Sequence, residues 1–135
     1  MLDKVLLIDD DETDHFFFKR LVSKTDLINE VLCFQYADEA LEYLETTDRP
    51  KISAIFLDIN MPRMNGFEFL EAAEKLLPDS FKDKAIVIML TSSIAPQDQE
   101  RAAEFDVIKA YINTPLDAEG LADIVSTISY QGFCK

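Results

Sequence analysis

The segment Val5-Leu6-Leu7-Ile8-Asp9-Asp10-Asp11 places four consecutive apolar residues directly before three aspartates. Two later segments repeat this design: residues 52–57 lead into Asp58, and residues 85–90 lead into Thr91. Continuous apolar runs of this length, rather than alternating ones, are typical of strands that are covered on both faces. These three segments therefore predict the central strands of a parallel sheet.

Residues 31–36 and 107–112 are weaker apolar runs, and we expect them to form the outer strands. Between the runs, apolar residues recur with helical spacing. The four apolar stripes are Phe17, Phe18, Leu21 and Val22; Ala37, Ala40, Leu41 and Leu44; Phe69, Ala73, Leu76 and Leu77; and Leu121, Ile124, Val125 and Ile128. Within residues 16–18, we expect core rings plus one exposed ring. Pro96 fits the first turn of a further helix over roughly 96–104. The alternation predicts an α/β fold of the three-layer (βα)5 type, with right-handed crossovers and a single domain over residues 1–135.

Composition limits the classes of function. The chain has 135 residues, and its 26 acidic residues against 13 basic ones leave a net charge of −13. Such a charge repels phosphate backbones and anionic lipid, so we expect no nucleic-acid and no membrane partner. The longest apolar run has six residues, far fewer than the ~20 that span a bilayer. With no signal peptide in the sequence either, we expect a cytoplasmic protein.

In an open parallel sheet, ligands bind beyond the carboxyl ends of the strands. The residues that follow the three central runs are Asp9-Asp10-Asp11, Asp58 and Thr91-Ser92. Crowded carboxylates repel one another, and a divalent cation relieves that repulsion. Oxygen ligands without nearby histidine or cysteine favour Mg²⁺, or Mn²⁺, over zinc. The sequence therefore predicts a site for a hard cation at this edge of the sheet.

An aspartate beside such an ion can attack phosphorus and form an aspartyl phosphate, with a hydroxyl such as that of Thr91 donating to a phosphoryl oxygen. A single aspartate at a strand end is more simply explained as a helix N-cap, and Asp11 and Asp14 fit that role. Carboxylates at two strand ends, with a hydroxyl at a third, are harder to explain by capping. We expect His15 to be a surface or half-buried residue of the first helix rather than a phosphohistidine.

The segment Leu57-Asp58-Ile59-Asn60-Met61-Pro62-Arg63-Met64-Asn65-Gly66 closely resembles the phosphoacceptor segment of the receiver domains of two-component response regulators. Residues 5–10 resemble the first strand of that family with its acidic pair, and residues 88–92 resemble the fourth strand with its Thr/Ser switch residue. The resemblance covers essentially the whole chain. It implies a flavodoxin-like, doubly wound sheet with strand order 2-1-3-4-5.

The resemblance also implies a role for each matching residue. Asp58 is the expected phosphoacceptor, and Thr91 is expected to hydrogen-bond the phosphoryl group. The expected Mg²⁺ ligands are Asp58, Asp10 directly, Asp9 largely through a water, and the backbone carbonyl of Asn60. Tyr111 matches the aromatic residue whose rotamer is coupled to the threonine in many members. A half-buried strand tyrosine is an equally good explanation of Tyr111.

One departure from the family concerns the lysine that usually ends the fifth strand and pairs with the phosphoryl group. Thr114 stands at that position, and it offers a hydrogen bond without a charge. Lys109 does not replace it, because five residues of strand span ~16 Å and the odd offset turns the side chain to the other face. Arg63, in the loop after Asp58, is the nearest plausible cation, although a solvated loop arginine explains it more simply.

The resemblance implies a stand-alone response regulator that takes a phosphoryl group from a sensor histidine kinase or a histidine phosphotransfer protein. It further implies a downstream protein partner on the surface of the fourth helix, fifth strand and fifth helix. Two alternatives remain open. Thr114 is compatible with a docking module that is never phosphorylated. Residues 9–13 also fit the nucleophile motif of haloacid-dehalogenase-type phosphatases, with Asp9 as nucleophile and Asp11 as acid/base, although this short match leaves the Asp58 segment unexplained.

Overall fold

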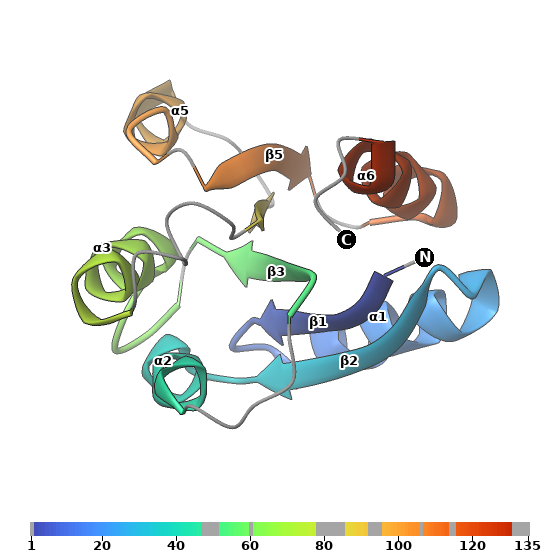
Figure 1. The fold of residues 1–135 in the computed structure, drawn as a ribbon, viewed down its shortest axis with the longest axis horizontal. Coiled ribbons are helices and arrows are strands. Elements are labelled where there is room, and N and C mark those ends of the chain that lie inside the picture. Colours follow the sequence, from blue (N-terminus) through green and yellow to red (C-terminus); the bar gives the residue numbers. More distant parts are fainter. Residues whose placement is uncertain are drawn as a thin grey trace.

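The structure is a computed structural model, and it describes residues 2–46, 52–59, 61–77, 86–91, 96–105, 107–113 and 116–130. This part of the chain alternates strands with helices (Figure 1). The strands are β1 (Leu2–Ile8), β2 (Ile28–Phe34), β3 (Ala54–Asp58), β4 (Val87–Thr91) and β5 (Ile108–Asn113). The helices are α1 (Glu12–Thr25), α2 (Ala37–Glu45), α3 (Gly66–Leu76), α5 (Pro96–Ala102) and α6 (Ala118–Tyr130).

The strands form one parallel sheet in the order β2-β1-β3-β4-β5. This order confirms the predicted doubly wound, flavodoxin-like fold. The register aligns Ile8 of β1 with Leu57 of β3, Leu57 with Met89 of β4, and Met89 with Tyr111 of β5. The central strands therefore reach the same edge of the sheet together, which brings the polar residues that follow them to one place.

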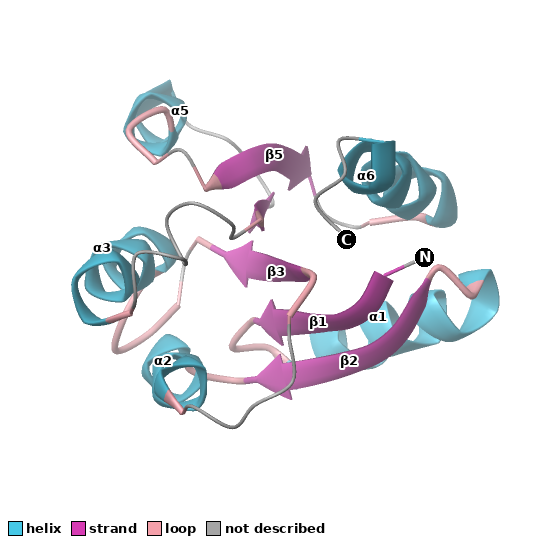
Figure 2. Ribbon diagram, viewed as in Figure 1, coloured by secondary structure: helices cyan, strands magenta, loops and turns pink. Residues whose placement is uncertain are grey.

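Helices cover both faces of the sheet, and each face has its own apolar core (Figure 2). One core joins β-strand side chains to residues of α2, α3 and α5, including the fully buried Phe69. The other joins them to α1 and α6 through residues such as Phe18 and Leu121. Burial on both faces explains why the central strands have continuous apolar sequences. None of the described helices has the length and apolar content required to cross a membrane.

Several strands are displaced by a few residues from the apolar runs that predicted them. β3, β4 and β5 each continue one residue past the run, because the ladder still pairs Asp58 with Leu90 and Thr91 with Asn113. β2 lies earlier than predicted, since the chain leaves the sheet and Tyr36 becomes the N-cap of α2. Hydrogen bonding, rather than apolarity, sets these ends. The last position of β3 is consequently the aspartate itself.

The buried faces of α1 and α3 are narrower than their apolar stripes predicted. Phe17 and Leu76 were expected in the core, yet each is 59% exposed, and Phe16 is 53% exposed. In α1 the core positions are Phe18 and Val22, four residues apart, because a helix resting on a sheet buries a narrow arc of its surface. The expectation of one exposed ring was therefore wrong, since two phenylalanines of α1 face outward and pack edge to face at 5.6 Å.

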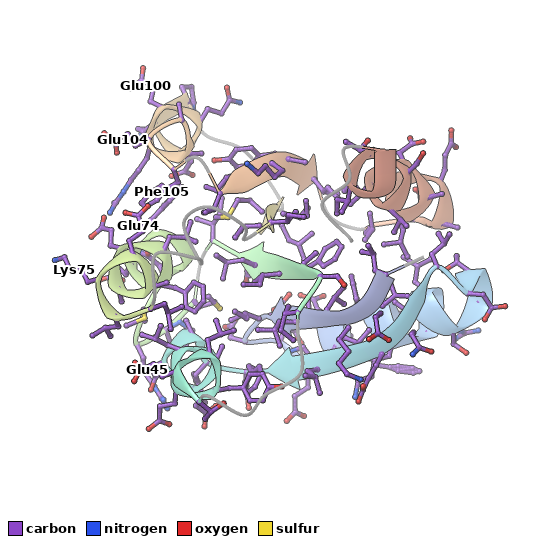
Figure 3. The ribbon with its side chains drawn as sticks, in the orientation of Figure 1. Glu45, Glu74, Lys75, Glu100, Glu104 and Phe105 are labelled. Atoms are coloured by element: carbon purple, nitrogen blue, oxygen red, sulfur yellow. The ribbon has the colours of Figure 1, made fainter. Side chains whose placement is uncertain are left out.

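Helix α5 is joined to α3 by aromatic and ionic contacts. Phe105, which follows α5, stacks on Phe67 of α3 with ring centroids 6.2 Å apart, and it lies between the two helices in Figure 3. Arg101 pairs with Glu71, and its guanidinium lies 5.1 Å from the centre of the Phe67 ring. α5 ends at Ala102 rather than at the predicted residue 104, before the chain turns into this aromatic contact.

Gly66 joins α3 to the end of β3 through a close backbone approach. Its amide donates to the carbonyl of Ile59 at 2.8 Å. A Cβ atom at this position would lie 2.8 Å from the carbonyl oxygen of Asp58 and 3.1 Å from the Cα of Ile59. Asn65 caps the helix in front of it, in a reciprocal capping box with Glu68. The start of α3 is thus seated directly against the backbone of the predicted phosphoacceptor.

We expect Gly66→Ala to lower the free energy of unfolding by about 1–3 kcal/mol, because backbone atoms must move to admit the methyl group. Urea denaturation measures this loss. Gly120→Ala is the matched control. Among the described residues, its Cβ would meet the side chains of Leu116 and Asp117, at 3.1 and 3.2 Å, and alanine favours a helix by up to about 1 kcal/mol. An equal loss of unfolding free energy in Gly66→Ala and Gly120→Ala would contradict the importance of the contact at Asp58.

Candidate functional site

Three carboxylates meet at the carboxyl edge of the sheet. Asp9 and Asp10 follow β1, and Asp58 is the last residue of β3. One carboxylate oxygen from each of them lies within 4.8 Å of those of the other two. The structure therefore brings together the three side chains that were predicted as metal ligands.

The register of the sheet explains this convergence. Since Ile8 pairs with Leu57, the next residues along each strand, Asp9 and Asp58, occupy adjacent positions. Side chains alternate along a strand, and Phe56, two residues before Asp58, belongs to the core beneath α1 and α6. Leu7, two residues before Asp9, belongs to the same core. Both aspartates thus face the side of the sheet that α1 covers.

Asp9 is the buried charged residue of the described part of the chain, with 4% of its surface exposed. Burial is the main cause that raises its pKa from 3.8 to about 8, because a carboxylate loses its hydration there. The negative charges of Asp58 and Asp14 raise the pKa further, and a hydrogen bond from the backbone of Asp11 opposes the shift. Without a counter-ion, burial and the neighbouring charges therefore favour the protonated form of Asp9.

Hydrogen bonds restrain the backbone of the acidic pair, Asp9 and Asp10, on several sides. The amide of Asp11 donates to Asp9 Oδ1 at 3.0 Å. His15 Nε2, from α1, lies 2.6 Å from the carbonyl oxygen of Asp9, and Gln35 Nε2 donates to the carbonyl of Asp10 at 3.3 Å. His15 is half-buried, as expected, but sequence reasoning missed both the His15 and the Gln35 contacts. A signal for the first was available, because helix side chains tilt toward the N-terminus and so reach back over the preceding loop.

Asp11 does not belong to the carboxylate cluster. It is exposed and caps α1, its side chain accepting from the amide of Thr13 at 2.9 Å. This confirms the capping role predicted for Asp11. A phosphatase of the haloacid-dehalogenase type would need Asp11 beside Asp9 at the reaction centre, whereas the cluster contains Asp58 instead. The cluster therefore lacks the pair of Asp9 and Asp11 that a phosphatase of this type would need.

Tyr111 lies half-buried on β5, where its hydroxyl donates to the carbonyl of Asp98 in α5 at 3.0 Å. Burial raises the pKa of this phenol, and the charge of Asp98 adds to the effect. The register places Thr91 two residues beyond Met89, the partner of Tyr111, so the two predicted switch residues are diagonal neighbours on adjacent strands. The backbone position of Thr91 ends β4, while its side chain is outside the described part of the structure.

Two predicted site residues, Asn60 and Thr114, lie outside the described residues. The roles assigned to them remain predictions. Ser92, which was expected beside Thr91, is also outside this part.

Arg63 was expected to be a solvated loop residue. Its side chain is half exposed, but it makes an ion pair and a contact with an aromatic ring. The guanidinium pairs with Asp38 of α2 and lies 3.9 Å from the centre of the Tyr36 ring. The ion pair raises the pKa of Arg63 and lowers that of Asp38. The backbone of Arg63 is left-handed, with φ of 70°, which a non-glycine residue adopts only when its surroundings hold it there. Arg63 thus anchors the loop after β3 to the start of α2.

The donor set suits Mg²⁺. Hard divalent cations prefer carboxylate and carbonyl oxygens, and the three clustered carboxylates offer these without a thiolate or imidazole among them. Asp9 is buried beside the negative charges of Asp58 and Asp14, which raise its pKa, and a bound divalent cation would offset those charges. Asp9, Asp10 and Asp58 are therefore the residues of this chain that would hold it.

Comparisons with known proteins agree with the fold. The family model of the response regulator receiver domain matches residues 5–126. A two-component response regulator from Cytophaga hutchinsonii has a crystal structure with a TM-score of 0.83 and 32% identity, covering 96% of this chain and 98% of that one. The chain belongs to the response regulator receiver domain family.

Two further relatives extend the comparison. A protein-glutamate methylesterase/protein-glutamine glutaminase from Burkholderia thailandensis is 34% identical over 119 residues, which cover 87% of this chain and 31% of that protein. The receiver domain of the sensor histidine kinase PA1611 from Pseudomonas aeruginosa, solved with magnesium in its active-site cleft, has the same fold, with a TM-score of 0.76 and 17% identity over 96% of this chain and 99% of that one. This chain spans 9–31% of the length of the curated relatives it matches.

The raised pKa of Asp9 predicts how stability depends on pH in the presence of a metal chelator. The folded protein binds the proton of Asp9 more tightly than the unfolded chain does, so this contribution is complete below about pH 4 and is lost as pH rises through 8. We expect Asp9→Asn to become progressively more stable than the wild type over this range, by at most about 1.4 kcal/mol per pH unit. Urea denaturation at a series of pH values measures the difference.

Asp11→Asn provides the control, because it removes a carboxylate while an asparagine still caps α1. Its stability relative to the wild type is expected to change little between pH 4 and 8. Parallel stability curves for the wild type and Asp9→Asn would show that burial does not raise the pKa of Asp9.

Proposed function

We propose that this chain accepts a phosphoryl group on Asp58 from a sensor histidine kinase or a histidine phosphotransfer protein, in a Mg²⁺-dependent reaction, and that it signals through protein contacts. The observation that carries the proposal is the position of Asp58 at the end of the central strand, with one carboxylate oxygen within 4.8 Å of oxygens of Asp9 and Asp10. The match to the receiver family supports the identity of the donor.

The chemistry required of the residues is simple. A carboxylate oxygen of Asp58 attacks the phosphorus of a phosphoimidazole, an O–P bond forms as the N–P bond breaks, and the imidazole leaves with a proton. Asp9, Asp10 and Asp58 would hold the cation, and the carbonyl of Asn60 is a further proposed ligand. When bound, Mg²⁺ neutralises charge on the phosphoryl oxygens. The same site would later hydrolyse the phosphoryl group or pass it on.

Thr91 and Tyr111 are the proposed switch residues. Thr91 would donate a hydrogen bond to the phosphoryl group, and Tyr111 would respond by changing its contact with the first turn of α5. Phosphorylation would thereby shift an existing equilibrium between two arrangements of α5, β5 and α6. We propose this surface for the downstream protein partner, and we propose a cytoplasmic location with no nucleic-acid or membrane partner.

The direct test is incubation with acetyl phosphate and MgCl₂, followed by intact-mass measurement. We expect the wild type to gain the mass of one phosphoryl group and Asp58→Ala to gain none, because that variant lacks the attacking oxygen. Asp11→Asn is expected to be labelled as the wild type is, since Asp11 lies outside the cluster.

Other outcomes would point to the alternatives. Absence of labelling in the wild type, under conditions that label a control receiver, would identify a docking module that is not phosphorylated. Labelling that survives Asp58→Ala and disappears in Asp9→Ala would identify the phosphatase mechanism.

The threonine at position 114 generates a separate prediction. Thr114→Lys would restore a charged partner for the phosphoryl group, so we expect a larger conformational response to beryllofluoride. Amide chemical shifts of β5 measure that response. Shift changes no larger than those of the wild type would contradict a role for position 114 in switching.

A further inference from the structure

We propose that His15 is a positioning residue for the acidic pair. Its imidazole holds the peptide unit that joins Asp9 to Asp10 and so sets the direction of the two carboxylates that would hold Mg²⁺. This inference rests on the proposed function, because it concerns the same acidic cluster.

The contact arises from the geometry of α1. His15 is the fourth residue of this helix, and helix side chains tilt toward the N-terminus, so the ring reaches back past the first turn. Its Nε2 lies 2.6 Å from the carbonyl oxygen of Asp9, in a partly buried setting. A carbonyl oxygen only accepts, so Nε2 carries the hydrogen and donates it. With Nε2 engaged in this way, His15 is a support for the acidic pair rather than a metal ligand.

Because a peptide unit is planar, fixing one of its atoms restrains both residues that it joins. The carbonyl of Asp9 and the amide of Asp10 share one such plane, and His15 holds the oxygen of that plane. The next peptide unit is held at both ends, since Gln35 donates to the carbonyl of Asp10 and the amide of Asp11 donates to Asp9 Oδ1. The preceding unit is held where the amide of Asp9 donates to the carbonyl of Phe34.

Three successive peptide units around the acidic pair are thus restrained, and His15 restrains the one between the two carboxylates. Releasing that unit would let the backbone at Asp9 and Asp10 rotate, and the mutual repulsion of the three clustered carboxylates would drive their side chains apart. A hard cation binds best where its ligands are already oriented, so this loss would appear mainly in metal affinity. A contact that merely strengthened α1 would instead affect stability.

The test compares two amide side chains that differ by one methylene group. The amide nitrogen of glutamine stands as many bonds from Cβ as Nε2 of histidine does, whereas that of asparagine is one bond shorter. His15→Gln can therefore donate to the carbonyl of Asp9, and His15→Asn cannot reach it. We expect His15→Asn to bind Mg²⁺ about tenfold more weakly than the wild type and His15→Gln to bind nearly as well. Calorimetric titration with MgCl₂ measures these affinities.

A second readout needs no metal. The amide of Asp11 donates to Asp9 Oδ1, so its hydrogen exchange reports on the orientation of the Asp9 side chain. In the presence of a chelator, exchange at this amide is expected to be faster in His15→Asn than in His15→Gln. Urea denaturation of both variants records stability separately. If His15→Asn does not fold, His15→Leu replaces it, because leucine fills similar space without a donor.

Equal Mg²⁺ affinities in the wild type, His15→Asn and His15→Gln would overturn the inference. An equal loss of Mg²⁺ affinity in His15→Asn and His15→Gln would also overturn it. Labelling of the wild type by acetyl phosphate distinguishes these results from a failure of the proposed function. A wild type that binds Mg²⁺ and is labelled, alongside His15 variants that behave identically, refutes the role of His15 alone. A wild type that neither binds Mg²⁺ nor is labelled refutes both proposals.

Discussion

Crowding of like charges at the ends of two adjacent parallel strands is the constraint around which this structure is arranged. β1 and β3 are buried on both faces, and their register leaves Asp9 and Asp58 side by side, with Asp10 completing the cluster. The apolar cores, rather than any attraction between the carboxylates, hold this repulsive arrangement together. Burial and the neighbouring negative charges both raise the pKa of Asp9, and burial is the larger cause. A cation bound at this point would relieve the repulsion between the carboxylates.

The fold could be predicted from the sequence because each central strand is a continuous apolar run that stops at a polar residue. Element ends were less predictable, since hydrogen bonding carries β3 as far as Asp58 and β4 as far as Thr91. The apolar stripes of α1 and α3 overestimated burial, because Phe17 and Leu76 have the right spacing but lie outside the arc that faces the sheet. Spacing along a helix identifies a face, and only packing decides how wide the buried part of it is.

The acidic cluster was predictable for the same reason as the sheet, since Asp9, Asp10 and Asp58 all come directly after apolar runs. The contacts of His15 and Gln35 were not, because they depend on how far a side chain reaches across the space between two elements. Arg63 shows a related limit. Its sequence context predicts a loop cation, whereas its pairing with Asp38 requires knowing that α2 begins beside that loop.

The anchor at Arg63 combines two forces that respond differently to dissolved salt. Its ion pair with Asp38 is half exposed, and counter-ions at physiological concentration already screen such charges over ~8 Å. The contact between the guanidinium and the Tyr36 ring depends on dispersion as well as charge, so it weakens less. At high salt concentration the contact with the Tyr36 ring would thus be the main interaction of this side chain. A lysine at position 63 has no planar group to stack on that ring, so it would lose its anchoring contacts at a lower salt concentration than arginine.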